Sequence, residues 1–275
     1  RELHIDAPKP ELEDWEQMVE RIRNRSREVH IGLVGKYVKL HDAYLSVAEA
    51  MNHAGYELNT FVKIHWIDSE NIRSDNVKEI LEGLDGIIVP GGFGNRGIEG
   101  MILSANYARE NQIPYFGICL GMQIAVIEFA RNVLGLKDAH SGEFDEQCEY
   151  KVIDFMPGQS EKIDKGGTLR LGSYPCSIKA GTKMEKCYGN KLIHERHRHR
   201  YEFNNKYREE LMRAGLVISG TSPDDRLVET VELKEHPFFV GVQFHPEFKS
   251  RPNQSHPLFK GFVSAALKES KRKEE

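Results

Sequence analysis

From residue 29 to about residue 136, short apolar stretches alternate along the chain with longer stretches whose apolar residues recur at helical spacing. The short stretches are rich in Val, Ile and Phe and are bounded by Gly, Pro or Asp, which is typical of buried strands. Asp42 is expected to cap the helix predicted at 42–55, and Gly55 is expected to end it. The pattern predicts strands at 29–37, 60–67, 85–90 and 113–118, and helices at 42–55, 76–81, 98–109 and 120–133.

Alternating strands and helices predict an α/β fold with a mostly parallel central sheet and helices on both faces. After Leu136 the sequence becomes rich in strands and turns. Strands are predicted there at 168–181, 196–204, 215–222, 226–233 and 238–244, with one helix near 205–214. We expect this second half to add mixed and antiparallel strands to the sheet.

The two ends of the chain differ from its middle. The first residues hold two prolines and a charged segment with Trp15 and Ile22 at helical spacing, which predicts a linker that contains a charged helix. Because the chain does not begin with Met, we expect it to be part of a longer protein. The predicted division is an interdomain linker at 1–28, a main domain at 29–268 that is closed by a helix at 257–267, and a charged, solvated tail at 269–275.

The composition is that of a globular protein and disfavours several classes of function. Lys and Arg (38) are slightly outnumbered by Asp and Glu (42), and the net charge of −4 would repel polyanions, so no nucleic-acid partner is expected. The most apolar stretch, 113–130, is interrupted by Pro114 and Glu128, so we expect no membrane association. Four cysteines without C-x-x-C spacing indicate a reducing, cytoplasmic location.

The segment Gly117-Ile118-Cys119-Leu120-Gly121 lies where a predicted strand meets a predicted helix. A nucleophile between two glycines can stand on a sharp strand-to-helix turn, because the glycines leave room for the backbone. The free N–H groups of a helix N-terminus also favour a thiolate. Cys119 is therefore the candidate nucleophile, and the alternative is an inert, buried cysteine.

His245 follows the last predicted strand, and Glu247 lies two residues beyond it. In an extended segment the two side chains would point to the same side, so the carboxylate could fix the tautomer of the imidazole. A cysteine nucleophile needs such a base and such an orienting group. The alternative for His245 is a structural histidine at the end of a strand.

Two consecutive glycines, Gly91 and Gly92, end another predicted strand and could turn a backbone N–H outward as an oxyanion donor. The loop at 92–97 also fits the G-x-G-x-x-G pattern of dinucleotide-binding proteins. That alternative lacks the acidic residue expected at the end of the next strand, which is followed by Cys119 instead.

Histidine and arginine alternate from His194 to Tyr201. Three interleaved arginines would repel a divalent cation, so a metal site is disfavoured. In a strand, Arg196, Arg198 and Arg200 would share one face, which suits a carboxylate or a phosphate. A solvated edge strand is the alternative.

Taken in order, PGGFG at 90–94, GICLGMQ at 117–123 and QFHPEF at 243–248 resemble the motifs of class I (triad) glutamine amidotransferases, whose fold is flavodoxin-like. The stretches at 34–55 and 195–204 more narrowly resemble the glutaminase domains of the CTP synthase family. The likeness covers nearly all of the predicted main domain.

This resemblance implies that the chain hydrolyses L-glutamine to glutamate and ammonia through a thioester. It implies a catalytic triad formed by Cys119 as nucleophile, His245 as general acid and base, and Glu247 as the orienting group. The implied substrate-binding residues are Gly92 and Leu120 as oxyanion donors, Gln123 and Glu143 for the amino-acid head group, and Arg200 for the α-carboxylate.

The family passes the ammonia to an N-terminal synthetase domain, which aminates ATP-phosphorylated UTP to CTP in pyrimidine nucleotide biosynthesis. The resemblance therefore implies no cofactor in this domain, ATP and Mg in the full enzyme, and GTP as an allosteric activator. It also implies a homotetrameric full-length enzyme. The loop at 93–100 is expected to respond to GTP, and the isolated domain is expected to be slow.

Several alternatives stay open on the same scaffold. γ-Glutamyl hydrolases share much of the triad and differ in the stretches that resemble the CTP synthase family. DJ-1-like proteins are disfavoured by the His-Pro-Glu triplet at 245–247. A catalytically silent regulatory domain is the alternative from another class, and the complete set of Cys119, His245 and Glu247 speaks against it.

Overall fold

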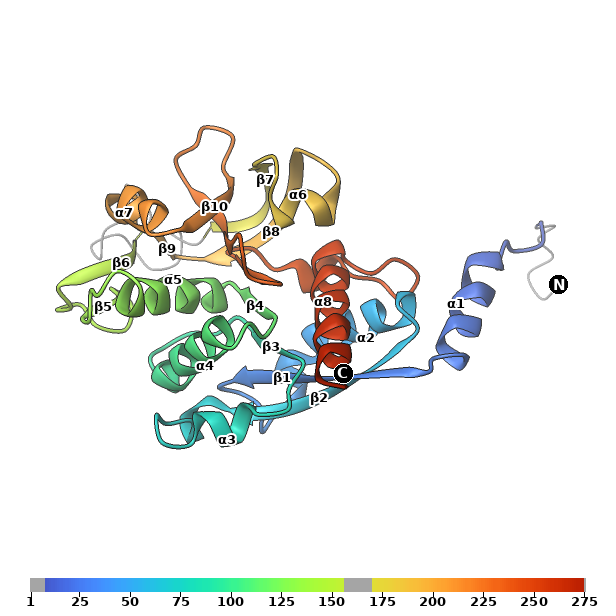
Figure 1. Cartoon of the computed structure of the whole chain (residues 1–275). Helices are drawn as coiled ribbons and strands as arrows, with labels where there is room; N and C mark the ends of the chain where they lie inside the picture. The colour runs from blue at the N-terminus through green and yellow to red at the C-terminus, as the bar shows by residue number, and fades with distance from the viewer. Residues whose placement is uncertain (1–7, 156–169, 275) are drawn as a thin grey trace.

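This computed structural model describes residues 8–155 and 170–274, which contain twelve strands and eight α-helices (Figure 1). The strands are β1 (Arg27–Gly35), β2 (Thr60–Asp68), β3 (Gly86–Val89), β4 (Tyr115–Ile118), β5 (Ala139–Ser141), β6 (Tyr150–Phe155), β7 (Arg170–Ile178), β8 (Leu192–His199), β9 (Tyr201–Phe203), β10 (Leu216–Thr221), β11 (Val228–Leu233) and β12 (Phe239–Val242). The helices are α1 (Glu13–Arg23), α2 (Leu45–Glu57), α3 (Val77–Leu81), α4 (Ile98–Glu110), α5 (Leu120–Asn132), α6 (Lys183–Tyr188), α7 (Arg208–Arg213) and α8 (Pro257–Glu274).

The main sheet has nine strands in the order β2–β1–β3–β4–β12–β11–β10–β7–β8. The strands from β2 to β12 in this order are parallel, and those from β11 to β8 pair antiparallel. A small second sheet has the order β5–β6–β9. The predicted fold, a mostly parallel sheet extended by antiparallel strands from the second half, is confirmed.

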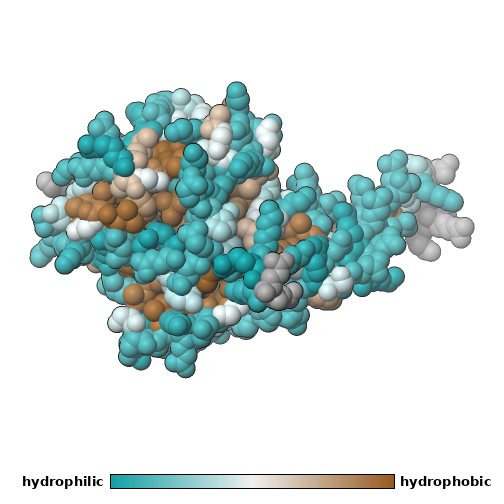
Figure 2. Space-filling view, viewed as in Figure 1, coloured by the Kyte–Doolittle hydropathy of each residue, from teal (hydrophilic) through white to brown (hydrophobic). Residues whose placement is uncertain are grey.

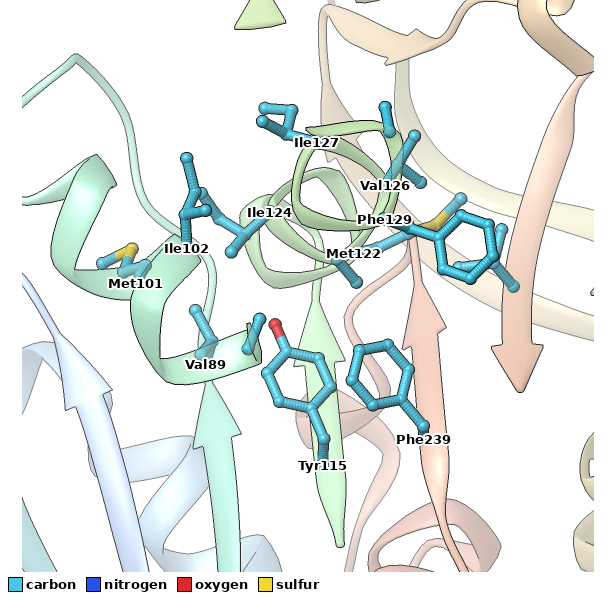
Figure 3. Close-up of a cluster of buried hydrophobic side chains, with 14 of the residues drawn as sticks. Val89, Met101, Ile102, Tyr115, Met122, Ile124, Val126, Ile127, Phe129 and Phe239 are labelled. Carbon is cyan, nitrogen blue, oxygen red and sulfur yellow. The ribbon is translucent and has the colours of Figure 1, made fainter. Parts of the chain in front are cut away.

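Helices cover both faces of the parallel part, as predicted. On one face, α4 and α5 pack against Tyr115 and Phe239, whose rings stack with centroids 4.6 Å apart (Figure 3). On the other face, α2 and α8 bury Phe116 together with Phe262. Each such fully buried side chain contributes about 1.5–3 kcal/mol to folding. The central strands β4 and β12 are thereby held side by side, and Cys119 follows the carboxyl end of β4.

Two expected boundaries of α2 were wrong. Asp42 does not cap the helix, because it lies in a short 3-10 turn from which α2 continues directly. Gly55 does not end it either, since α2 runs on to Glu57. A Cβ at Gly55 would lie 2.7 Å from the carbonyl oxygen of Thr60. This glycine therefore permits close packing of α2 on β2, and the helix stops two residues later.

The last helix is longer than expected. α8 continues to Glu274, and Glu269 is 5% exposed while it accepts hydrogen bonds from Arg272. Lys273 Nζ lies 3.2 Å from a carboxylate oxygen of Asp85. Three charged residues of this segment, Glu269, Arg272 and Lys273, therefore make ion pairs, one of them with the residue before β3.

The predicted charged helix near the N-terminus is confirmed as α1, which projects from the rest of the molecule in Figures 1 and 2. Met18 is its buried residue, whereas Trp15 is 47% exposed. The division into linker, main domain and tail stays a prediction. No described helix is both long enough and apolar enough to cross a membrane.

Candidate active site

Cys119 stands on the sharp turn between β4 and α5. Its backbone φ is 52° and its ψ is −98°, a conformation that residues other than glycine rarely adopt and that costs about 1–3 kcal/mol. The glycines on both sides are required by space. A Cβ at Gly117 would overlap the carbonyl oxygen of Gly121, and a Cβ at Gly121 would overlap that of Val89. The predicted strand-to-helix turn is confirmed.

His245 and Glu247 come from the segment after β12, the strand beside β4. His245 Nδ1 lies 2.8 Å from Glu247 Oε1. The two residues meet through a 3-10 turn at Pro246–Lys249, and not through the extended segment that the sequence suggested. The ring of Phe248 stacks on the imidazole, with centroids 5.4 Å apart. The turn thus fixes both the plane and the tautomer of His245.

His245 faces Cys119 across a glycine. A Cβ at Gly91 would lie 2.9 Å from His245 Cε1 and 3.6 Å from Cys119 Cβ, so glycine is needed for the two residues to approach. Burial lowers the pKa of His245, but Cys119 and Glu247 outweigh burial and raise this pKa from 6.5 to about 10. The imidazole is therefore protonated near neutral pH and can stabilise a thiolate on Cys119.

A small cavity of about 50 Å³ opens beside the sulfur of Cys119. It lies at the carboxyl ends of the parallel strands, where α/β folds bind their ligands. The structure brings all five predicted substrate-binding residues to it. They are Gly92, Leu120, Gln123, Glu143 and Arg200. Their individual roles stay predictions.

The N–H groups of Gly92 and Leu120 were predicted to bind an oxyanion, and these roles stay predictions. Leu120 is the first residue of α5, so its N–H has no acceptor within the helix. The N–H of Cys119 is not available, because it donates to Val242 at 2.7 Å. Gly92 lies across from Leu120, and a Cβ there would lie 3.3 Å from Leu120 Cδ2. The arrangement suits a negative oxygen between Gly92 and Leu120.

Glu143 is one of the charged residues that line the cavity. Burial raises the pKa of its carboxyl, and the opposing effects come from a hydrogen bond donated by the Gly94 N–H at 3.2 Å and from the charges of Lys36 and Arg200. Arg200 carries the charge that a glutamine α-carboxylate would need, and Glu143 the charge that an α-ammonium would need.

Lys36 was missed by the sequence analysis. Its side chain is 3% exposed and donates to the carbonyl oxygens of Phe93, at 3.1 Å, and of Gly94. Burial lowers its pKa to about 8, although Glu143 acts in the opposite direction. Lys36 thus anchors the glycine loop next to the cavity. The sequence feature that could have identified Lys36 is its charge directly after the buried end of β1.

Gln243 was also missed. Its Nε2 lies 3.6 Å from the sulfur of Cys119, and its Oε1 lies 3.4 Å from Gln123 Nε2. Gln123 Nε2 also donates to the carbonyl oxygen of Tyr201 at 3.0 Å. The signal was a single amide in an otherwise apolar strand end. The amide pair connects the nucleophile to the wall of the cavity.

The run of histidines and arginines forms β8, whose residues alternate between exposed and buried. Arg196 and Arg198 share the exposed face, as expected. Arg200 does not share it, because it follows the end of the strand, and this lets its side chain reach the cavity. The buried positions hold His197 and His199, each 2% exposed. Within the described residues, no three His, Cys, Asp or Glu side chains are grouped to hold a metal ion.

Comparison with known proteins identifies relatives of the chain. Residues 39–265 match the family model for class-I glutamine amidotransferases. The chain is 59% identical over 265 residues to a CTP synthase of Listeria innocua, and 60% identical over 271 residues to one of Carboxydothermus hydrogenoformans. These matches cover 96% and 98% of this chain. The chain spans about half the length of these curated relatives, 50% and 51%.

A solved structure gives the same result for the fold. The glutaminase domain of Trypanosoma brucei CTPS, with bound acivicin, superposes with a TM-score of 0.83 at 42% sequence identity. The match covers 87% of this chain and 94% of that chain.

Proposed function

The chain belongs to the class I glutamine amidotransferases, as a glutaminase domain of the CTP synthase type, and we propose that it hydrolyses L-glutamine with Cys119 as the nucleophile. One observation carries this assignment. The thiol of Cys119 stands on a strained turn and faces His245, which is hydrogen-bonded to Glu247. Cys119 lines a cavity, and Arg200 lines the same cavity.

In the first half of the proposed reaction, the thiolate of Cys119 attacks the γ-carboxamide carbon of glutamine, and the carbonyl electron pair moves onto oxygen. The N–H groups of Gly92 and Leu120 stabilise this oxyanion. When the tetrahedral intermediate collapses, the C–N bond breaks and His245 gives its proton to the departing ammonia. A γ-glutamyl thioester on Cys119 remains.

In the second half, the now neutral His245 takes a proton from water, which attacks the thioester carbon. The C–S bond breaks, the electron pair returns to Cys119 as thiolate, and glutamate leaves. Glu247 holds the imidazole in one tautomer through both halves, because its carboxylate oxygen accepts a hydrogen bond from the Nδ1–H of His245. Arg200 and Glu143 hold the substrate's α-carboxylate and α-ammonium.

The chain's relatives are about twice as long, which bears on where the ammonia goes. We propose that a synthetase domain of the same protein receives it and aminates UTP with ATP and Mg, and that GTP activates the glutaminase site. The homotetrameric assembly and the cytoplasmic location are parts of the same proposal. Free glutamine is the proposed substrate in preference to γ-glutamyl peptides.

The test is labelling with 6-diazo-5-oxo-L-norleucine (DON), a glutamine analogue whose reactive carbon is attacked by an amidotransferase thiolate. Peptide mass spectrometry is expected to find the adduct on Cys119 and on none of Cys148, Cys176 and Cys187. Excess L-glutamine should protect Cys119. An adduct on another cysteine, or faster hydrolysis of γ-glutamyl peptides than of glutamine, would contradict the proposal.

Replacing Glu247 with Gln is expected to lower kcat/KM for glutamine by about two to four orders of magnitude. The neutral amide removes a negative charge that raises the pKa of His245, and it can also stabilise the wrong tautomer. Steady-state ammonia release measures the effect. Glu210→Gln is the control and should behave as wild type, because Glu210 lies on α7 and is not among the residues that line the cavity. Equal kcat/KM in the two variants would remove Glu247 from the mechanism.

A further inference from the structure

Two buried histidines that the proposed reaction does not use are linked to the glutamine cavity. His199 Nδ1 lies 3.1 Å from the carbonyl oxygen of Tyr201, and His199 Nε2 lies 3.1 Å from His197 Nδ1. At the far end, His197 Nε2 lies 3.5 Å from Glu229 Oε2. The side chains of His197 and Glu229 are fully buried. These three contacts form a continuous row from β11 through β8 to the cavity wall.

The hydrogen-bond directions in this row follow from what each atom can do. A carbonyl oxygen only accepts, so His199 Nδ1 must hold a proton and donate to Tyr201. In a neutral ring His199 Nε2 is then an acceptor, and His197 Nδ1 must donate to it. His197 Nε2 is consequently an acceptor as well. It faces Glu229 Oε2, which as a carboxylate oxygen would also be an acceptor.

Three contacts therefore need three protons, and two neutral rings supply two. Both His197 Nε2 and Glu229 Oε2 are buried without a hydrogen-bond partner among the described residues. Arg170 Nη1 donates to the other oxygen, Glu229 Oε1, at 2.6 Å. It also lies 3.5 Å from His197 Nδ1, but that nitrogen already carries the proton shared with His199. The missing third proton lies on Glu229 or on one of the two rings.

The surroundings favour Glu229 as the site of this proton. Burial, followed by the charge of Arg170, lowers the pKa of His197 to about 2 and that of His199 to about 3, so both rings are neutral. Burial raises the pKa of Glu229 to about 7, against the effect of Arg170. The other charged or titratable groups near the row are Tyr174, whose ring packs on His197, and Cys176 on β7, Glu195 on β8, Glu202 on β9, Asp224 and Arg226 before β11, and His245 after β12.

We propose that a proton on Glu229 completes a relay through His197 and His199 that positions Tyr201 at the wall of the glutamine cavity. The proposal rests on the proposed glutaminase function. Tyr201 matters to the site because its carbonyl also accepts from Gln123, and because Tyr201 and the adjacent Arg200 both line the cavity. Glu229, His197 and His199 are positioning residues, since none of them is assigned contact with the reacting atoms.

Loss of the proton from Glu229 disturbs this wall. Two protons then remain for three contacts, so one contact joins two lone pairs whichever tautomers the rings adopt. Below the pKa of Glu229 the relay is complete, and above it the relay is broken. Binding of a glutamine analogue should therefore weaken as the pH rises through about 7, while the chemistry at Cys119 changes less.

The experiment measures how the rate of DON labelling depends on DON concentration, at pH values from 6 to 8.5. The concentration at half-maximal rate gives KI, the apparent dissociation constant of DON, separately from the maximal labelling rate. In wild type we expect KI to rise about threefold to tenfold over this range, the effect of one buried hydrogen bond. In Glu229→Gln the amide N–H donates permanently to His197 and the amide oxygen accepts from Arg170. KI should then stay near the low-pH value of wild type at every pH.

Glu232→Gln is the matched control. Burial also raises the pKa of Glu232, but its carboxylate accepts from the backbone N–H groups of Lys183 and Met184 and is not part of the row, so its variant should keep the pH dependence of wild type. The relay is overturned if Glu229→Gln follows the wild-type pH profile, or if Glu232→Gln abolishes it. Iodoacetamide alkylation of Cys119, which does not need binding of an α-carboxylate or an α-ammonium, should be alike in all three proteins.

A second measurement does not depend on reactivity toward glutamine analogues. NMR of the ¹⁵N-labelled histidine rings of wild type at pH 6 should show that His197 and His199 are neutral and protonated at Nδ1. Protonation at Nε2, or an imidazolium at either position, would overturn the relay even if Glu229→Gln did not fold. Wild type that takes no DON label would instead count against the proposed function, and the NMR result would still decide the relay.

Discussion

Replacement of Cys119 with alanine is expected to abolish glutamine hydrolysis, by at least about four orders of magnitude in kcat, and to leave the fold intact. Without the sulfur there is no attacking atom and no thioester. Alanine keeps the Cβ and the backbone requirement of the turn, and it removes only the contacts of the sulfur atom, such as the one at 3.6 Å with Gln243 Nε2. Ammonia release measures the activity, and thermal unfolding measures the fold.

The control for this substitution is Cys148→Ala. Cys148 is also a free, buried cysteine, but it lies in the segment between β5 and β6 and does not line the cavity. Its variant should hydrolyse glutamine at the wild-type rate. Residual turnover by purified Cys119→Ala within tenfold of wild type would exclude Cys119 as the nucleophile.

Gly121→Ala is expected to lower the free energy of unfolding by about 3 kcal/mol or more and to remove most of the activity. Gly121 lies in the first turn of α5, where a Cβ would overlap the carbonyl oxygen of Val89. That oxygen belongs to the backbone of β3, which cannot rotate away as a side chain can. Either α5 or β3 must shift, which would move the two predicted oxyanion donors, Leu120 at the start of α5 and Gly92 just after β3.

Gly261→Ala on α8 is the matched control, because it also replaces a helical glycine by alanine. The nearest atom to its new Cβ would be Cys187 Sγ at 2.6 Å, the end of a side chain that can adopt another rotamer. Both substitutions gain about 1 kcal/mol of helix propensity, so this gain cancels in the comparison. Urea unfolding should show a loss that is much larger for Gly121→Ala. Equal losses would mean that the turn tolerates a side chain.

The parallel half of the fold was predictable because its central strands, β3, β4 and β12, are short apolar runs. The burial of all four residues in β3, β4 and β12 agrees with this pattern. β5, β6 and α6 were not predicted. β5 has three residues and α6 has six, and such short elements are formed by contacts with the rest of the fold more than by local pattern.

The candidate site could be predicted as far as its motifs reached. Cys119, His245 and the substrate-binding candidates all stand in glycine-rich or strand-end motifs, and the structure brings them together. Their roles stay predictions. Lys36, Gln243 and the pair His197 and His199 were not assigned, because each is a polar residue whose importance depends on burial. Burial is decided by strand order, which the local sequence does not contain.

The order of the strands in the sheet also bears on synthesis of the protein. β12 occupies the position between β4 and β11, both of which leave the ribosome before it. A nascent chain that has emerged only through β11 already carries Cys119, but it has neither His245 nor the strand that holds this histidine beside the thiol. We therefore expect insertion of β12 to be a late event in folding, since it joins segments far apart in sequence. Ammonia release is thereby deferred until translation of the domain is nearly finished.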